Sequence, residues 1–242
     1  MSASSNTAPR LLLKVSGEGF AREGETGLDT ERVKHLAAQL NELAAAGVQV
    51  ACVIGGGNIL RGKQSESLGI ARATADYMGM LATVINGLAL SDALESNGVQ
   101  TRVMSAIDVH KVCEPFIRRR ALRHLEKGRV VILVGGLGSP YFTTDTTAAQ
   151  RGIELDCTRL VKATMVDGVY DKDPRVHADA VRQPRLTFDQ VLEQQLQVMD
   201  QTAFTLCREN DLPIVVFDMN AERGLILAAQ GEPIGTLIEN PS

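Results

Sequence analysis

The sequence predicts an α/β fold with a central, mostly parallel sheet, and three observations support this prediction. Short β-branched apolar runs alternate with longer segments in which apolar residues recur at helical spacing. Runs such as residues 129–134 (RVVILV) show no alternation, which is typical of strands that are buried on both faces. Several of the runs end in glycine-rich turns. Strands that alternate with helices in this way are joined by right-handed crossovers into a parallel sheet.

The composition fits a globular protein and excludes some functions. The 242 residues are 44% hydrophobic and carry a net charge of −4 at pH 7. A nucleic-acid partner is not expected, because such proteins need clustered positive charge, although local basic patches stay open. The four cysteines contain no CxxC pair, so they are expected to be core residues in a reducing cytoplasm rather than zinc ligands or disulfides.

The chain is expected to form a single domain at residues 10–242 after a frayed tail at residues 1–9. The tail lacks the basic start and apolar segment of a targeting signal. No later apolar run is expected to reach the ~20 residues of a membrane span, so no membrane partner is expected.

The first half of the chain predicts four strands with three helices between them. Asp29 is a suitable N-cap and Gly47 a suitable end for the first helix, and Pro115 suits the first turn of the third. Strands are expected at residues 11–15, 48–54, 99–104 and 129–134, and helices at residues 29–46, 70–96 and 115–127.

The second half predicts a helix, a strand, a loop and further elements. Thr143, Thr144 and Asp145 are good N-cap types for the first of these helices. The expected elements are helices at residues 144–155, 187–195 and 200–209, strands at 159–164 and 213–217, a loop at 167–174, and a last helix and strand.

Three glycine-rich turns follow strands, and none matches a standard fingerprint. Residues 57–63 (GNILRGK) have the spacing of a P-loop, but Gln64 stands where that motif needs Ser or Thr for Mg²⁺. Neither larger glycine cluster has the GxGxxG pattern of a dinucleotide site. Taken singly, each cluster is equally well explained as a tight turn.

Taken together, the three turns indicate a phosphate site. They lie at the same edge of a parallel sheet, and Lys14 and Arg61 add two cations to their many N–H donors. Phosphoryl transfer needs such a collection, because its transition state offers the protein little work beyond positioning and charge stabilisation.

Several motifs together resemble the bacterial uridylate (UMP) kinases of the amino acid kinase family. They are KVSGE at 14–18, IGGGN at 54–58, DYMGMLATVINGLAL at 76–90, FTTD at 142–145, LVKAT at 160–164 and VDGVYDKDP at 166–174. The resemblance covers nearly the whole chain. It implies a three-layer αβα sandwich and transfer of a phosphoryl group from ATP to UMP in pyrimidine nucleotide biosynthesis.

The resemblance also implies where ATP binds. Lys14 would be the main transition-state cation and Arg61 would clamp the transferred phosphoryl group. Mg²⁺ would accompany ATP, and no protein residues form a pattern typical of a metal site. The implied ATP-binding residues are Lys14, Val15, Ser16, Gly17, Gly57, Arg61, Thr164, Tyr170 and Asp173.

For UMP, the resemblance implies that Asp76 accepts from the ribose hydroxyls. Asp145 would orient the catalytic lysines Lys14 and Lys162, and a lysine in a buried strand does call for an anionic partner. The other implied UMP-binding residues are Gly56, Leu137, Gly138, Ser139, Pro140, Tyr141, Phe142, Thr143 and Thr144.

The resemblance to bacterial UMP kinases further implies a homohexamer that GTP activates and UTP inhibits. Candidate effector residues here are Asp92, Arg102, Arg118, Arg119, Arg120, Arg123 and Arg129, although a solvated basic helix face is the better explanation for any one arginine. Two other functions stay open: a related kinase that acts on an amino acid or carbamate, and a non-catalytic nucleotide or oxyanion binder on the same fold.

Overall fold

The central sheet of the computed structural model contains nine strands, and the structure describes residues 8–60, 68–174, 176–196 and 198–241. All neighbouring strands are parallel except β10 and β11, so the predicted mostly parallel sheet is confirmed. In order across the sheet, the strands are β4 (Glu114–Pro115), β3 (Thr101–Ser105), β5 (Val130–Val134), β2 (Gln49–Ile54), β1 (Arg10–Val15), β6 (Arg159–Thr164), β10 (Ile214–Asp218), β11 (Thr236–Glu239) and β9 (Arg185–Thr187).

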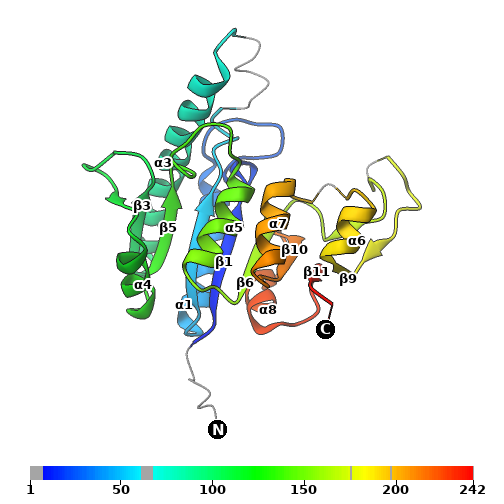
Figure 1. Ribbon diagram of the computed structural model, residues 1–242. Coiled ribbons are helices and arrows are strands. Elements are labelled where there is room, and N and C mark those ends of the chain that lie inside the picture. Colours follow the sequence, from blue (N-terminus) through cyan, green and yellow to red (C-terminus); the bar gives the residue numbers. More distant parts are fainter. Residues whose placement is uncertain (1–7, 61–67, 175, 197, 242) are drawn as a thin grey trace.

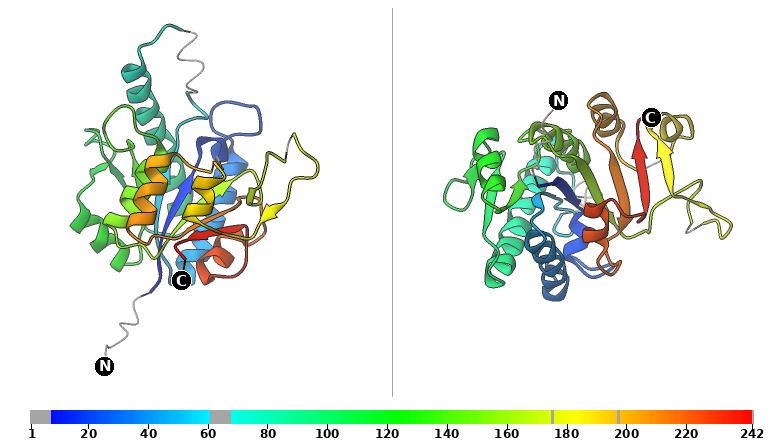
Figure 2. Two further views of the ribbon diagram at one scale, coloured as in Figure 1. Left: turned by 45° about the vertical axis from the view of Figure 1, so that its right-hand side comes forward. Right: turned by 90° about the horizontal axis from the view of Figure 1, so that it is seen from below.

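Helices cover both faces of the sheet (Figures 1 and 2). One layer consists of α1 (Thr30–Ala45), α3 (Arg72–Ser96) and α8 (Gly224–Gln230). The other consists of α4 (Arg118–Glu126), α5 (Thr144–Glu154), α6 (Phe188–Glu193) and α7 (Gln201–Glu209). In β1, Leu11 and Leu13 pack with the first layer and Leu12 with the second, which explains why this strand shows no polar alternation.

Two predicted helix starts are confirmed by their caps. The Asp29 carboxylate accepts a hydrogen bond from the Arg32 N–H at 2.9 Å, which caps α1. The Thr143 hydroxyl accepts from the N–H groups of Asp145 and Thr146 at 3.0 and 3.2 Å, which caps α5. Both caps satisfy N–H groups that a helix start leaves without partners.

The prediction that Pro115 begins a helix is wrong. Pro115 lies in β4 opposite Ser105 of β3, and α4 begins only at Arg118. Proline has no N–H to donate, and β4 is the edge strand of the sheet, where one side of the strand needs no partner.

The predicted loop at 167–174 also contains a short strand. β7 (Val169–Tyr170) pairs with β8 (Arg182–Gln183) in a separate two-stranded sheet. A 3-10 helix, η1 (Gly17–Phe20), follows β1 directly. Pairs of two residues leave too little periodic pattern to be predicted from the sequence.

The helix α3 is long and apolar enough to pass for a membrane span, which the sequence reading overlooked. Its most apolar window has a mean hydropathy of 1.2, and 44% of that window is buried. A core helix passes the same test, and α3 packs on α1, β3 and β5, so its hydropathy is weak evidence for a membrane. Its N-terminal end extends past the sheet edge at which β1 and β2 end (Figure 1).

Candidate active site

The turns after β1 and β2 lie against each other with no room for a side chain. These strands are parallel neighbours, and Val15 is opposite Ile54 at their ends. A Cβ atom at Gly17 would lie 2.3 Å from the Gly57 nitrogen, and one at Gly55 would lie 2.7 Å from the Gly17 nitrogen. The glycines therefore allow two N–H-bearing turns to form one continuous lining at the sheet edge.

Replacing Gly17 by alanine is expected to separate these two turns. The added methyl group meets backbone rather than a flexible side chain, so the strain of about 1–3 kcal/mol must move a loop. We expect weaker ATP binding and a much lower kcat in a protein that still folds. Calorimetric ATP titration and a thermal melt measure the two effects, and unchanged ATP affinity would contradict the close approach.

A buried pair of amides ties the turn after β2 to α3. The Asn58 and Asn86 side chains exchange hydrogen bonds of 3.0 and 2.7 Å, and they are 1% and 0% exposed. Asn86 also donates to the Gly55 carbonyl and Asn58 to the Gly27 carbonyl, both at 2.7 Å. Because buried amides need all their partners, this network holds the glycine turn in one position.

Two lysines share one carboxylate at the ends of β1 and β6. Lys14 and Lys162 lie opposite each other in these neighbouring strands, on the face that α5 covers. The Asp145 carboxylate, in the first turn of α5, lies 2.8 Å from each ammonium nitrogen, through Oδ1 to Lys14 and through Oδ2 to Lys162. Lys162 also donates to the Val198 carbonyl.

The three charged side chains of this cluster are largely buried, and each charge affects the pKa values of the others. Burial favours the neutral acid of Asp145, but the two ammonium groups outweigh it and hold the pKa of Asp145 below its usual value. For Lys162, burial lowers the pKa, Asp145 opposes the shift, and Lys14 adds to it. Three charges carry a net excess of one positive charge, which suits an anion at this edge.

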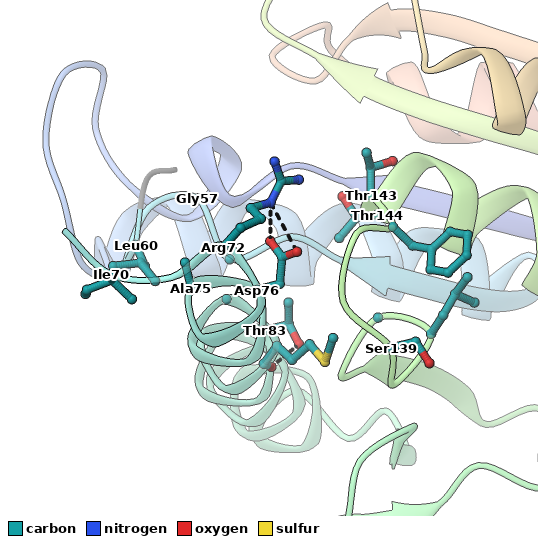
Figure 3. A pocket seen from close by; sticks show the side chains of 16 residues that line it. Gly57, Leu60, Ile70, Arg72, Ala75, Asp76, Thr83, Ser139, Thr143 and Thr144 are labelled. Carbon is teal, nitrogen blue, oxygen red and sulfur yellow. Dashed lines mark hydrogen bonds and ion pairs between the residues drawn. The ribbon is translucent and has the colours of Figure 1, made fainter. Parts of the chain in front are cut away.

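A pocket of about 640 Å³ opens beside the glycine turns, between α3 and the loop that follows β5 (Figure 3). Its predicted UMP-binding members are Gly56, Asp76, Leu137, Ser139, Phe142, Thr143 and Thr144. Gly138, Pro140 and Tyr141 belong to the same loop without lining the pocket. Gly57, Leu60, Ile70, Arg72, Ala75, Gly79, Met80, Thr83 and Gly136 complete the wall.

Asp76 is held from two sides at the mouth of this pocket. Its carboxylate accepts from the Arg72 Nε at 3.0 and 3.1 Å, one helical turn earlier (Figure 3). It also accepts from the Tyr141 N–H at 2.8 Å, and Tyr141 adopts a left-handed backbone conformation with φ 72°. This bond closes the loop over α3 and fixes the orientation of the carboxylate.

The predicted ATP residues of the C-terminal half lie at the last residue of β6 and in the loop that follows this strand. The Thr164 hydroxyl donates to the Val166 carbonyl at 2.7 Å, which turns the chain after the strand. Tyr170 donates its hydroxyl to Asp167 at 2.6 Å, and this bond raises the pKa of Tyr170. Asp173 follows β7 in the same loop. Of the predicted ATP residues that follow Lys14 at the end of β1, Val15 is buried and Ser16 is half-buried.

Arg61 lies outside the described residues, so its predicted contact with the transferred phosphoryl group has no structural description. The described cations near the glycine turns are Lys14 and Lys162 at the strand ends and Arg72 in the pocket wall.

Two of the candidate effector arginines contact one glutamate, and a third contacts the histidine beside that glutamate. Glu114 lies 3.5 Å from Arg102 and 3.8 Å from Arg120, and it lies 3.3 Å from the His124 ring. Arg129 contacts the other nitrogen of that ring at 3.0 Å. These side chains are far more basic than acidic as a group, and the fold brings them together from β3, β4, α4 and the turn before β5.

The remaining effector candidates are dispersed. Arg118 pairs with Asp156 at 2.7 Å, and Arg123 pairs with Glu126 of its own helix at 3.1 Å. Arg119 and Asp92 are exposed on α4 and α3. Exposed pairs of this kind contribute little stability, which fits a solvated helix face.

No cluster of three or more metal-ligating side chains occurs among the described residues. The Asp145 carboxylate, at the sheet edge where β1 and β6 end, already has an ammonium group beside each of its oxygens. A divalent cation at this edge therefore suits ligands that a phosphorylated substrate brings with it.

Sequence reasoning missed several residues that organise the site. Arg72 and Asp200 look like ordinary charged residues of a helix start, and Asn58 and Asn86 like ordinary polar ones. Asparagine within an otherwise apolar helix was the one available signal, because a buried amide requires a partner.

The arrangement defines a class of protein that binds phosphorylated compounds at the edge of a parallel sheet. The model of the amino acid kinase family matches residues 9–218. The chain belongs to the amino acid kinase family.

Relatives and solved structures extend this similarity over almost the whole chain. A uridylate kinase from Xanthomonas oryzae pv. oryzae is 54% identical over 233 residues, which cover 96% of this chain and 97% of the relative. The fold matches the crystal structure of UMP kinase from Bacillus anthracis with a TM-score of 0.93 at 39% identity, covering 96% of both chains. UMP kinase from Ureaplasma parvum matches with a TM-score of 0.91 at 36% identity, covering 96% of this chain and 99% of that one.

Proposed function

We propose that this protein is a UMP kinase, which transfers the γ-phosphoryl group of ATP to UMP and forms ADP and UDP. The observation that carries the proposal is the pair of lysines on Asp145, next to a pocket that Asp76 lines. The cluster suits a transferred phosphoryl group, and the pocket suits an acceptor with a sugar. The names of the similar proteins, uridylate kinase and UMP kinase, support the same substrates.

The reaction needs no strong general base. A phosphate oxygen of UMP is already ionised and attacks the γ-phosphorus of ATP. The bond from that phosphorus to the β–γ bridging oxygen breaks, and its electron pair stays on the β-phosphate of ADP. The protein's task is to align the groups and to stabilise charge on the oxygens of the transferred group.

The ATP side of the site begins at the glycine turns. Lys14 and Lys162 stabilise the transferred group, and the N–H groups at Ser16, Gly17 and Gly57 bind phosphate oxygens. Asp145 holds both lysines in place. Arg61 clamps the transferred group, and residues 164–173 hold adenine and ribose through Thr164, Tyr170 and Asp173. Mg²⁺, bound by the ATP phosphates themselves, neutralises part of their charge.

On the acceptor side, UMP lies in the 640 Å³ pocket. Its ribose hydroxyls donate to Asp76, its base lies against the loop at 137–144, and its phosphate points to Gly56 and Gly57. The carboxylate of Asp76 is suited to this role because its orientation is already fixed by Arg72 and the Tyr141 N–H.

Replacing Asp76 by asparagine is expected to raise KM for UMP more than it lowers kcat. The contact is made equally in the ground state and the transition state, so it contributes mainly to uniform binding. Steady-state kinetics with varied UMP measure both constants. A fall in kcat at unchanged KM would instead make Asp76 a participant in the chemical step. Asp189→Asn, which removes an exposed carboxylate that pairs with Arg208 and does not line the pocket, is the control for kinetics with UMP.

One assay separates the proposed function from its rivals. ADP release is measured with UMP, CMP, acetylglutamate or carbamate as the acceptor. Turnover with UMP alone, or with UMP far above CMP, supports the proposal. Turnover with acetylglutamate or carbamate would identify a related kinase, and ATP binding without any turnover would identify a non-catalytic nucleotide binder.

The proposal includes the setting in which the enzyme works. Residues 10–242 act as a single domain in a cytoplasmic homohexamer that supplies pyrimidine nucleotides. GTP activates it and UTP inhibits it. The contacts of Arg102 and Arg120 with Glu114, and of Arg129 with the adjacent His124, support an effector that carries phosphates. Measuring activity and sedimentation with each nucleotide tests this regulation.

A further inference from the structure

We propose that Asp200 is a positioning residue for phosphoryl transfer, which holds the start of α5 and faces Lys162 so that the Lys162–Asp145 pair keeps its reacting geometry. This inference rests on the proposed function. Asp200 does not line the pocket itself, so it acts through other residues.

A single carboxylate connects the first turns of two helices. Asp200 is the N-cap of α7 and accepts from the Ala203 N–H at 2.9 Å. The Thr146 hydroxyl lies 2.9 Å from each oxygen of the same carboxylate. The Thr143 hydroxyl donates to Oδ2. A cap needs only one of these bonds, so the two threonines give Asp200 a second task.

Through Thr143, this contact reaches the catalytic carboxylate. The Thr143 hydroxyl that donates to Asp200 also accepts from the Asp145 N–H at 3.0 Å. Asp145 is therefore held at its backbone by a residue that Asp200 orients, and at its side chain by two lysines. A shift of Thr143 would move both the carboxylate and the pocket wall, because Thr143 lines the pocket.

The same segment reaches Lys162 in two further ways. The Val198 carbonyl, two residues before Asp200, accepts from the Lys162 ammonium group. Asp200 also adds negative charge near that ammonium group, which favours its protonated form. In the described residues, the charges facing Lys162 are Asp145 on α5, Lys14 on β1 and Asp200 at the start of α7.

The decisive variant is Asp200→Asn, which keeps the shape of the side chain and a capping oxygen but removes the charge. We expect kcat to fall by roughly tenfold or more, since small displacements of reacting groups are costly, while KM for UMP changes less. We also expect the alkaline limb of kcat/KM for ATP to move to lower pH by several tenths of a pH unit, because Lys162 loses its proton more easily.

Two controls separate charge from structure. Asp189→Asn removes an exposed carboxylate that pairs with Arg208, near the other end of α7, and should change neither kcat nor the pH profile. Thr146→Val removes one hydrogen bond but leaves the charge of Asp200, so kcat should fall while the alkaline limb stays in place.

A measurement independent of turnover completes the test. With ¹³C-labelled lysine, the Lys162 side chain is titrated by NMR and assigned by its loss in Lys162→Arg. A lower Lys162 pKa in folded Asp200→Asn supports the proposal. An unchanged titration and an unchanged kcat, with only a lower melting temperature, would reduce Asp200 to a helix cap and overturn it. If the unaltered protein does not phosphorylate UMP, the proposed function fails, whereas the NMR titration still reports on Asp200.

Discussion

Replacing Lys14 by methionine is expected to lower kcat by roughly 100- to 1000-fold, which corresponds to about 2.7–4 kcal/mol of lost transition-state stabilisation. Lys14 is only 7% exposed and lies near the end of β1. Water therefore has little access to this position and could not substitute for the lost ammonium group. Methionine is unbranched and only one atom shorter than lysine, and it removes the charge, so packing should change little. KM for UMP should stay close to its original value, because Lys14 does not line the acceptor pocket.

Lys34→Met provides the matched control for this experiment. Lys34 lies on α1, where its ammonium group forms an exposed pair with Glu31 at 3.1 Å. Its loss should leave kcat unchanged and cost less than about 1 kcal/mol of stability. Steady-state kinetics of both variants with saturating ATP measure the difference. If Lys14→Met turns over UMP as fast as the control, Lys14 has no part in the mechanism.

Replacing Asp145 by asparagine is expected to impair both stability and catalysis. The change leaves two buried ammonium groups beside each other without the carboxylate that they share, and breaking a buried pair in this way costs about 3–5 kcal/mol. Catalysis should fall as well, because both lysines lose the group that orients them. Urea unfolding at pH 7 measures the stability, and kinetics at a temperature where the variant is folded measure kcat.

The pH dependence of this stability difference has a definite sign. Because the folded protein holds the pKa of Asp145 below its usual value, the carboxylate's contribution is complete above the unfolded pKa of about 3.9. It is lost as the pH falls through the lower folded pKa. The gap between the unaltered protein and Asp145→Asn should therefore be constant near neutrality and narrow in acid. A gap that widened in acid would exclude the ion pairs as its cause.

Asp179→Asn serves as the control for the unfolding experiment. Asp179 pairs with Lys172 at 2.6 Å, as Asp145 does with its lysines, but its side chain is 79% exposed. Water and salt screen such a pair, so its loss should cost less than about 1 kcal/mol.

The sheet and most of its helices could be predicted because their residues carry the information locally. A run such as residues 130–134 is apolar throughout and is indeed buried at every position. Lys162 could be singled out for the same reason, since a lysine in such a strand requires an anionic partner. The site edge followed from the strand ends, where parallel strands bring their turns together.

The remaining parts of the site depend on contacts between distant residues. Asp200 meets Thr143 across 57 positions of sequence, and Asp76 meets Tyr141 across 65. Nothing near either aspartate distinguishes it from an ordinary helix residue. The prediction for Pro115 failed for a related reason. Proline is suited to a strand at the edge of a sheet, and the position of β4 at the edge depends on how the whole sheet is assembled.

The reciprocal amide bonds of Asn58 and Asn86 have a geometric consequence for substrate length. They connect the turn that contains Gly57 to the helix that carries Asp76, and Gly57 and Asp76 line the same pocket. The separation between the Asp76 carboxylate and the turn at Gly57 is thus fixed by two buried side chains. If UMP binds as proposed, this fixed separation should select an acceptor by the span from its ribose to its phosphate, independently of the identity of its base.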